Sequence, residues 1–447
     1  MQFKNSEGQW DYVALAALFL LAFSFLFGGA SQNYALRLSL IELASLPLLV
    51  LAAAHIVQTR GWREHRFALA LLSVVLAIPL IQLIPLPPAL WTRLPGRDEL
   101  VLALDLVGLV PGWAPMSLTP DRTWGSTLAL APPAALFLAA LTMSNVLGER
   151  LAQFCIAAAI AGILLGTAQL ASGGDDLYLW NWAHTGVLTG SFANRNHLAS
   201  SLLVTLPFAM IFGAATLRRR ERRNSALWLA ALFAGLVVVA IAATRSRTGI
   251  TLFAPVMAIS LIAAWIAAGR GRPNPSLLVM VGSVGAALTV VVVLALPPIL
   301  ARFDSDRPEE RFERWPLMAE AAQTYLPLGS GIGSFDTVYR SVEPLEELDG
   351  RFFNQAHNDY LETWLEAGWL GIAVLLAFLV WYSRRTWTAW KAPPSREGDL
   401  QRAASIGIGV LLLHSFVDYP LRTMTLAVVF ALCCGLLEWA RRPYQNR

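Results

Sequence analysis

The sequence predicts an all-α, polytopic membrane protein with about twelve transmembrane helices and one large outward-facing loop between the ninth and tenth spans. Of the 447 residues, 56% are apolar and only 14% are charged, whereas soluble domains carry roughly 25% charged residues. Apolar runs of the length that crosses a bilayer recur along the chain, about 20 residues each. A soluble protein of this composition could not solvate its surface, so we expect a membrane protein.

The apolar runs place the expected spans. They cover residues 12–28, 38–57, 67–86, 124–145, 151–171, 197–216, 226–243, 248–268, 276–300, 367–383, 403–417 and 422–439. Prolines inside several of them are tolerable where neighbouring helices satisfy the backbone groups that proline leaves open. The first run follows an acidic and aromatic stretch and has no clear cleavage site, so it is interpreted as a span rather than a signal peptide.

The distribution of basic residues orients these spans. With the N-terminus in the cytoplasm, the inner connections, the residues next to the first span and the C-terminal tail hold 20 of the 34 lysines and arginines. Short cytoplasmic loops are enriched in basic residues. We therefore expect a multi-pass membrane protein with both termini cytoplasmic and the long loop facing outward.

Three regions follow from this topology: a membrane domain at 1–300, a catalytic loop at 301–366 and C-terminal membrane helices at 367–447. The loop region is the long polar segment of the chain. Fourteen of the 30 acidic residues lie between Asp304 and Glu366, together with several arginines and, near its end, His357. Because polar side chains are so unevenly distributed, we expect this loop to carry the chemistry.

Two features of the loop have local interpretations. Residues 311–322 have helical spacing, with Arg311 and Arg314 away from the apolar face. The glycine-rich stretch 327–335 lacks the flanking strand and downstream acid of a nucleotide-binding motif, so a tight turn with close backbone approach is favoured. His357 is expected to open a helix on which Asp359, Glu362 and Glu366 neighbour one face.

Two arginines lie at the membrane edge on the predicted outer side. Arg245 and Arg247 fall in the short connection Ala243–Thr248, with almost no loop to solvate them. Their long side chains could simply extend to the interface. Ionisable residues at membrane depth usually face a cavity and a partner, however, so the alternative is an anion-binding site.

A second polar segment opens the span at 197–216. Asn194 and Asn196 stand at a helix start, where side-chain oxygens cap free amides. Capping does not explain Arg195 and His197 beside them, so these four side chains are interpreted as a polar rim. Residues 87–122 are rich in proline and tryptophan and are predicted to form an outer hairpin lying on the bilayer surface.

Several motifs in order resemble the O-antigen ligase and O-antigen polymerase superfamily of bacterial envelope glycosyltransferases. These motifs are Gly190-x-Phe192-x-Asn194-x-Asn196-His197, Ser246-Arg247 before Gly249, Arg311 four residues before Trp315, Pro327-Leu328-Gly329-x-Gly331-x-Gly333-x-Phe335, His357-Asn358 with Gly368 and Gly371, and His414-Ser415-Phe416-Val417-Asp418-Tyr419-Pro420-Leu421. Each is weak alone, but together they cover about residues 180–425.

The resemblance implies transfer of a glycan from an undecaprenyl-pyrophosphate donor to a hydroxyl acceptor, in cell-surface polysaccharide (lipopolysaccharide) biosynthesis. The acceptor would be a glycan, a lipid A core or another hydroxyl. It implies no nucleotide, no metal and no cofactor. By resemblance, His357 activates the acceptor or contacts the donor, and Arg247 and Arg311 bind the pyrophosphate. Arg245, Arg195 and Arg314 are added from their positions alone, with Asn194, Asn196, His197 and Asn358 as supporting residues.

The chemistry of these residue types suits the reaction. A pyrophosphate leaving group develops negative charge, which arginines stabilise in a dehydrated pocket, and a neutral histidine can take a proton from a hydroxyl. We expect a metal-independent inverting enzyme. The sequence does not separate ligase, polymerase and protein glycosyltransferase, and the acidic segment Glu343–Asp349 has no assigned role.

The main alternative is a transporter of a small anion or glycolipid with no covalent chemistry. It predicts internal repeats and charges at mid-membrane depth, and neither is evident. A structural assembly subunit gives no reason for Arg245 and Arg247. The cysteines (Cys155, Cys433 and Cys434) lie in apolar runs and indicate neither a disulfide framework nor a metal site. The net charge of +4 is uninformative, and we expect membrane lipids but no nucleic acid as partners.

Overall fold

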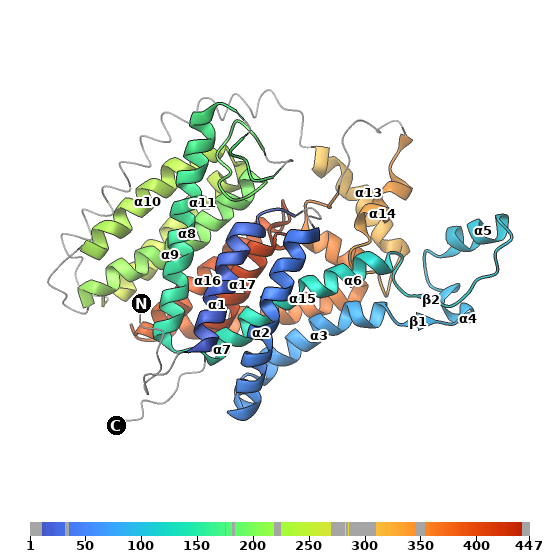
Figure 1. Cartoon of the computed structure of the whole chain (residues 1–447), viewed down its shortest axis with the longest axis horizontal. Helices are drawn as coiled ribbons and strands as arrows, with labels where there is room; N and C mark the ends of the chain where they lie inside the picture. Colours follow the sequence, from blue (N-terminus) through green and yellow to red (C-terminus); the bar gives the residue numbers. More distant parts are fainter. Residues whose placement is uncertain are drawn as a thin grey trace.

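Helix α9 (Arg195–Arg218) forms the centre of the bundle. Nearly every side chain between Leu198 and Thr216 is buried, and α8, α10, α11 and α16 pack around it (Figure 1). A helix that is apolar on all sides is stable only where other helices or lipid cover every face. Here the cover is protein, so the surrounding helices, rather than α9, meet the lipid.

The computed structural model describes residues 11–31, 35–174, 176–180, 184–218, 225–269, 310–345 and 354–439, with the isolated residues 282 and 285. The N-terminal elements are α1 (Tyr12–Phe27), α2 (Ala35–Gln58), η1 (Gly61–Arg63), α3 (Arg66–Gln82), β1 (Pro85–Leu86), α4 (Pro88–Trp91), α5 (Asp98–Leu106), β2 (Ala114–Pro115), α6 (Pro120–Ala129), α7 (Ala131–Thr142) and α8 (Asn145–Ser172). After α9 come α10 (Ser225–Thr244), α11 (Arg247–Ala267), α13 (Glu310–Thr324), α14 (Phe335–Val342), α15 (Asp359–Lys391), α16 (Arg396–His414), η3 (Pro420–Arg422) and α17 (Met424–Glu438).

Each predicted span that the structure describes overlaps a helix, but the spans 67–86 and 403–417 extend past the ends of α3 at Gln82 and of α16 at His414. Within the described ranges, seven helices are long and apolar enough to cross a membrane, counting α6 and α7 as one, and α1, α3 and α17 are shorter apolar helices. Helix α16 carries charged residues in its first turns. The chain is thus an all-α membrane protein. The expected span at 276–300 lies outside the described residues, and the total of twelve stays a prediction.

Successive helices alternate in direction between two ends of the bundle. One end, called here the His357 end, gathers the starts of α9, α11, α15 and α17 and the connection 415–423. At this end Gly28 at the end of α1 accepts a hydrogen bond from the amide of Thr425, and Gly29 accepts one from Ala193. The sequence-based separation of 226–268 into two helices is confirmed, because Arg245 and Ser246 divide α10 from α11.

The opposite end, called here the ion-pair end, joins the predicted inner connections through charged side chains. The described pairs are His65–Glu438, Arg385–Glu438, Arg396–Glu149, Arg218–Asp399 and Arg402–Asp399. Arg402 is completely buried and also donates to the carbonyl of Ala389 at 2.8 Å. Buried charges require such partners, so this end of the bundle is cross-linked by ionic contacts.

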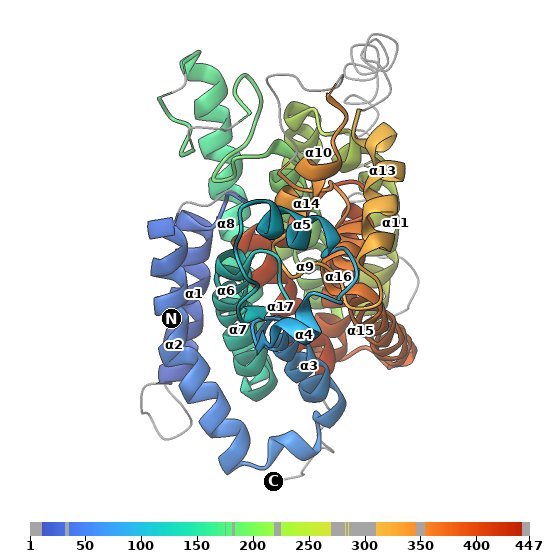
Figure 2. The ribbon, with the colours of Figure 1, turned by 90° about the vertical axis from the view of Figure 1, so that its right-hand side faces the viewer.

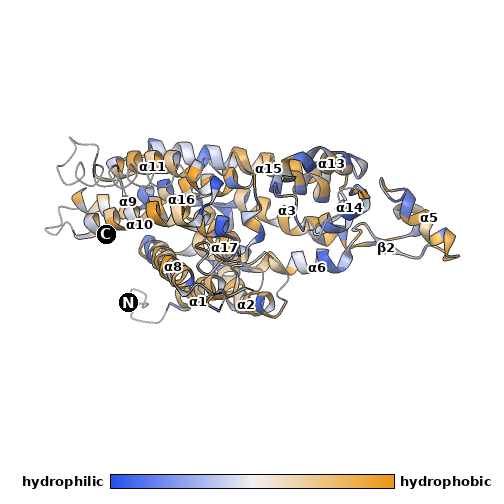
Figure 3. Cartoon of the chain, turned by 90° about the horizontal axis from the view of Figure 1, so that it is seen from above, coloured by the Kyte–Doolittle hydropathy of each residue, from blue (hydrophilic) through white to orange (hydrophobic). Residues whose placement is uncertain are grey.

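The segment between α11 and the membrane part of α15, whose described residues 310–345 and 354–367 are called here the loop domain, has a small core of its own. Helices α13 and α14 and the start of α15 supply it, and they lie together on one side of the molecule (Figures 1 and 2). Its buried side chains are Met318, Ala321, Ala322, Phe335, Val338, Tyr339, Ala356 and Leu365. Figure 3 shows that hydrophilic residues are frequent on α13 and α14. The predicted helix at 311–322 is confirmed as α13.

The proline- and tryptophan-rich segment forms a hairpin that projects sideways from the bundle (Figure 1). Strands β1 and β2 pair antiparallel at its base, and Trp91 Nε1 donates to the carbonyl of Gly112 at 2.7 Å. Beyond this base, Leu106, Val110 and Trp113 are largely exposed. An exposed apolar hairpin beside membrane helices is compatible with the predicted interfacial position.

Candidate functional site at the His357 end

His357 lies directly before α15 with its backbone in the left-handed region, at φ 51°. A non-glycine residue adopts this conformation at a cost, and such residues concentrate at functional sites. Its flanks are fixed: the amide of Ala356 donates to Oε2 of Glu362 at 3.0 Å, and the amide of Asp359 donates to the carbonyl of Ser415 at 2.9 Å. The backbone around His357 is therefore held in place by α15 and by the 415–423 connection.

The imidazole ring of His357 has a defined orientation. Its Nδ1 lies 3.0 Å from the carbonyl oxygen of Gln355, and because a carbonyl can only accept, Nδ1 carries the hydrogen. In the neutral ring Nε2 then holds the lone pair. The ring packs edge-on against Tyr419, with 4.8 Å between centroids. The sequence placed His357 as the first residue of the helix, but the N-cap is Asn358, whose Oδ1 accepts from the amides of Tyr360 and Leu361.

The polar start of α9 meets the connection 415–423. Asn194 Oδ1 accepts from the amide of Asn196 at 2.9 Å, as a capping side chain does. Asn196 Nδ2 instead donates to Oδ2 of Asp418 at 2.7 Å. His197 is fully buried and its Nδ1 is hydrogen bonded to the hydroxyl of Thr423 at 2.8 Å. Asn196 and His197 therefore attach α9 to this connection, while the capping interpretation holds for Asn194.

Asp418 is the carboxylate at the centre of this region. It is fully buried, and Nε2 of His414 lies 3.8 Å from its Oδ2. Burial alone raises the pKa of a carboxyl, but His197, His414 and His357 outweigh that effect and hold the pKa of Asp418 well below its usual range. A buried negative charge thus lies among three of the six histidines of the chain.

The start of α11 brings Arg247 to the same end. Arg247 is the first residue of α11, behind the N-cap Ser246, whose Oγ accepts from the amide of Gly249 at 3.0 Å. A Cβ on Gly249 would lie 2.7 Å from Cβ of Ala199, so α11 and α9 touch closely one turn inside their starts. The arginine therefore lies near the polar start of α9 and at the positive end of a helix dipole.

Two of the three arginines predicted from their positions, Arg195 and Arg245, also stand next to the starts of α9 and α11. Arg195 is the first residue of α9 and is partly buried. Arg245 is exposed and has a left-handed backbone, at φ 52°. Both lie at the His357 end, beside α9 and α11 respectively.

Arg314 lies inside the loop domain, where its Nη1 donates to the hydroxyl of Tyr339 at 2.8 Å and lies 3.4 Å from Oε1 of Glu343. Burial raises the pKa of Tyr339 to about 12, against the opposing effect of Arg314. Glu343 is the described part of the acidic segment predicted at 343–349, and residues 346–349 lie outside the described residues. So does the side chain of Arg311. Arg314 thus cross-links α13 to the end of α14.

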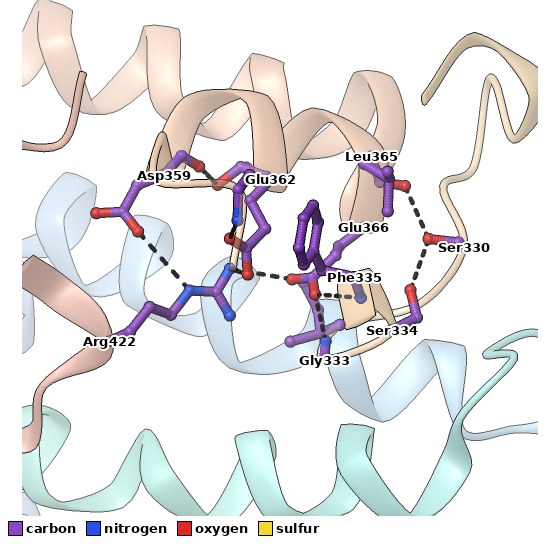
Figure 4. Close-up of polar contacts among 12 residues, drawn as sticks. Ser330, Gly333, Ser334, Phe335, Asp359, Glu362, Leu365, Glu366 and Arg422 are labelled. Atoms are coloured by element: carbon purple, nitrogen blue, oxygen red, sulfur yellow. Dashed lines mark hydrogen bonds and ion pairs between the residues drawn. The ribbon is translucent and has the colours of Figure 1, made fainter. Parts of the chain in front are cut away.

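The acidic face of α15 surrounds one arginine (Figure 4). Arg422 Nη2 lies 3.1 Å from Oε1 of Glu362 and 3.1 Å from Oε2 of Glu366, and its Nε lies 3.7 Å from Oδ1 of Asp359. Burial lowers the pKa of a guanidinium, but these carboxylates outweigh it and raise the pKa of Arg422 above its usual value. Asp359, Glu362 and Glu366 are all buried. We call these four residues the carboxylate clamp.

The glycine-rich stretch 329–335 uses its amides within the protein. Ser330 and Gly331 donate to the carbonyls of Leu365 and Glu366, and Gly333 and Phe335 donate to Oε1 of Glu366 at 2.9 and 3.2 Å. The remaining amides, those of Gly329, Ile332 and Ser334, donate to Tyr325 O, Gln82 Oε1 and Gly331 O. Since these donors are engaged, the stretch is a turn held against α15 and α3. This agrees with the predicted tight turn, whose backbone approaches neighbouring elements closely.

The sequence motifs therefore bring together His357, Asn194, Asn196, His197 and Arg247 at one end of the bundle. Sequence reasoning did not select Arg422, Asp418 or His414 as site residues. Asp418 and His414 belong to the motif 414–421. Their polarity in a short connection between two apolar runs is the sequence signal that could have identified them. Arg422 follows that motif directly, and its carboxylate partners are about 60 residues earlier in the chain, which hides the pairing.

Comparison with known proteins addresses the family. A family model described as O-antigen ligase matches residues 229–376, about a third of the chain. A search of the curated proteins gave no match. The matched region holds α11, α13 and α14, the carboxylates of the clamp and His357. It supports glycosyl transfer of the O-antigen ligase or polymerase type in general. Residues 229–376 thus match the O-antigen ligase family, which supports the resemblance that the sequence motifs predicted.

Proposed function

We propose that this protein transfers a glycan from an undecaprenyl-pyrophosphate donor to a hydroxyl acceptor, with inversion at the anomeric carbon and without a metal. The observation that carries the proposal is the convergence of His357, with Nε2 as its basic atom, and the arginine-bearing helix starts of α9 and α11 at one end of a membrane bundle. Among the described residues, no group of three or more His, Cys, Asp or Glu side chains is arranged to hold a metal.

In the proposed reaction, Nε2 of His357 takes the proton of the acceptor hydroxyl as its oxygen attacks the anomeric carbon. The bond from that carbon to the pyrophosphate oxygen breaks, and the leaving group departs with the electron pair. Arg247 and the start of α11 stabilise the developing charge, and Arg195, Arg245 and Arg311 are the further candidates. The proton on His357 then passes to solvent or to the departing pyrophosphate.

The membrane bundle suits a donor with a polyprenyl tail, because the tail can stay in the bilayer while the sugar reaches the His357 end. We infer that this end faces the periplasm and that the ion-pair end, which gathers the basic connections, faces the cytoplasm of the bacterial inner membrane. The acceptor is a lipid A core or other terminal hydroxyl in a ligase, the next lipid-linked repeat in a polymerase, and a protein hydroxyl in a protein glycosyltransferase.

The experiment is a complementation test in the native host. A strain lacking the protein is complemented with wild type, with His357→Ala or with His55→Ala, a matched control at an exposed position near the far end of α2. Lipid-linked glycans and finished polysaccharide are then resolved on gels. We expect wild type and His55→Ala to restore the glycan, and His357→Ala to leave its precursors on the lipid carrier.

The stranded species identifies the reaction. Long polymers on undecaprenyl pyrophosphate indicate a ligase, and single repeat units indicate a polymerase. A missing protein-linked glycan indicates a protein glycosyltransferase. A normal glycan pattern with His357→Ala would overturn the catalytic role of His357 and bring the transporter alternative forward.

A further inference from the structure

The carboxylate clamp places three carboxyl groups around a single guanidinium. Asp359, Glu362 and Glu366 each lie within 4 Å of Arg422, and all three are at least nine-tenths buried. With every group ionised, three carboxylates and one guanidinium give a formal charge of −2. Like charges in a buried site repel strongly unless a cation lies among them, so the arrangement depends on Arg422.

The second oxygen of each carboxylate accepts a hydrogen bond from another segment of the chain. Glu362 accepts from the amide of Ala356 through Oε2 at 3.0 Å, and Ala356 precedes His357. Glu366 holds the turn at 333–335 through Oε1. Asp359 accepts from the hydroxyl of Ser415 at 2.7 Å. The clamp thus ties the segment carrying His357 to the turn at 333–335 and to the 415–423 connection.

Arg422 and Tyr419, whose ring packs on His357, both belong to the connection 415–423. It lies in η3, three residues after Tyr419, whose ring is 4.8 Å from that of His357. The guanidinium fixes the carboxylates on α15, while its own backbone fixes Tyr419. One side chain therefore sets the distance between the two elements that meet at His357, whose left-handed backbone needs support on both sides.

We propose that Arg422 and Glu362 are positioning residues for His357. Arg422 neutralises part of the charge on α15 so that Glu362 can hold the amide of Ala356, and this contact keeps the imidazole against Tyr419 with Nε2 directed for proton transfer. Neither residue is assigned a contact with substrate. This inference rests on the proposed function, since it concerns the geometry of the proposed base.

The test compares Arg422→Met with the double variant Arg422→Met/Glu362→Gln. The double variant has the formal clamp charge of wild type, −2, and glutamine keeps an oxygen that can accept from Ala356. Arg422→Met/Glu320→Gln is the matched control, because Glu320 is an exposed carboxylate on α13. Lipid-linked glycan extracted from the deletion strain serves as the donor, and initial rates are measured against its concentration with purified, detergent-solubilised protein.

We expect Arg422→Met to lower kcat by about 100-fold, the scale of a 1 Å displacement of a catalytic group, with KM for the extracted donor changed less than about threefold. Adding Glu362→Gln should recover at least a tenth of the wild-type rate, whereas Glu320→Gln should recover nothing. Arg422→Lys keeps the charge but not the planar fork of the guanidinium, so its kcat should lie between those of wild type and Arg422→Met. It also provides a folded variant if the methionine variant unfolds.

A large increase of KM with Arg422→Met or Arg422→Lys, without recovery by Glu362→Gln, would mean that Arg422 binds the pyrophosphate, and the inference would be wrong. An unchanged kcat in both Arg422 variants would also overturn it. A failure of the proposed function would give a different result. In that case His357→Ala would keep the wild-type rate, and the Arg422 variants would report only on stability.

Discussion

At the scale of single residues, the proposed site combines a base with a fixed ring and arginines at helix starts. Nδ1 of His357 is oriented by the carbonyl of Gln355, which places the lone pair of the neutral ring on Nε2. Arg247 is the first residue of α11, and helix starts already favour anions. The base and the anion-binding groups come from different helices, so their relative position depends on the packing of α9, α11 and α15.

Substitution of Arg247 should reduce transfer in proportion to the lost phosphate contacts. A charge-assisted hydrogen bond contributes roughly 1.5–3 kcal/mol, so Arg247→Ala should lower kcat/KM by about 10–100-fold, and Arg247→Lys should retain part of the activity. Initial rates with extracted lipid-linked glycan give the comparison, with Arg63→Ala, an exposed arginine in η1, as the control. Equal rates for wild type and Arg247→Ala would remove Arg247 from the site.

The residues that sequence alone could select are those whose polarity contradicts their surroundings. His357, Arg247, Asn194 and His197 stand at the edges of apolar runs, where a polar side chain needs a reason. Arg422 does not stand out in this way, because a basic residue at the end of a span is ordinary. Its role depends on ion pairs to residues 56 to 63 positions earlier, which the sequence pattern does not display.

At the scale of elements, α15 links the loop domain to the membrane. It runs from Asp359 to Lys391 but has a break at Gly368, with φ 57° and ψ −146°. There the amide of Trp369 donates to the carbonyl of Pro327 at 2.9 Å. The polar carboxylate face lies before the break, and the apolar part follows it. Hydropathy placed a boundary at 366/367, beside this break, where two helical segments meet at a kink. It could not indicate the kink itself, because composition reports where polarity changes and not the backbone angles of Gly368.

Gly368→Ala should destabilise the protein. A Cβ there would lie 2.2 Å from the carbonyl oxygen of Pro327, and the left-handed backbone adds strain. Strain of this kind costs on the order of 1–3 kcal/mol, before the clash is relieved. Thermal unfolding of purified protein should show a lower Tm. Gly235→Ala is the control, because no atom within 4 Å obstructs a Cβ at that position in α10, and a helix interior favours alanine by about 0.5–1 kcal/mol. A Tm for Gly368→Ala at or above that of Gly235→Ala would contradict this account.

At the scale of the whole molecule, the alternating helices separate two chemically different ends. The ion-pair end joins α3, α8, α9, α15, α16 and α17 through charged contacts, whereas the His357 end holds the proposed base. The sequence predicted this separation through the bias of basic residues and the lengths of the apolar runs. It could not predict that α9 becomes the central helix, since every apolar run is equally compatible with a lipid-facing position.

The two ends should react with impermeant reagents from opposite sides of the membrane. Cys155, Cys433 and Cys434 are buried, so the wild-type chain provides an unreactive background. An impermeant maleimide should label Gln323→Cys on α13 in intact spheroplasts and should label Arg60→Cys, beside η1, only after permeabilisation; both positions are exposed. The reverse pattern would invert the proposed orientation, and labelling of both from one side would contradict the placement of the bundle across the membrane.

The central position of α9 also sets an order for biogenesis. Its partner α16 begins at Arg396, well over a hundred residues after α9 ends. At synthesis rates of about 5–20 residues per second, α9 therefore spends roughly ten seconds or more in the bilayer before α16 exists to cover it. During that interval the hydroxyls of Ser200 and Thr205 can bond within their own helix, as Thr205 does to the carbonyls of Ser201 and Leu202. The last eighth or so of the chain thus closes the protein around a helix inserted long before, and a nascent chain that stops short of α16 leaves its central helix exposed to quality-control proteases.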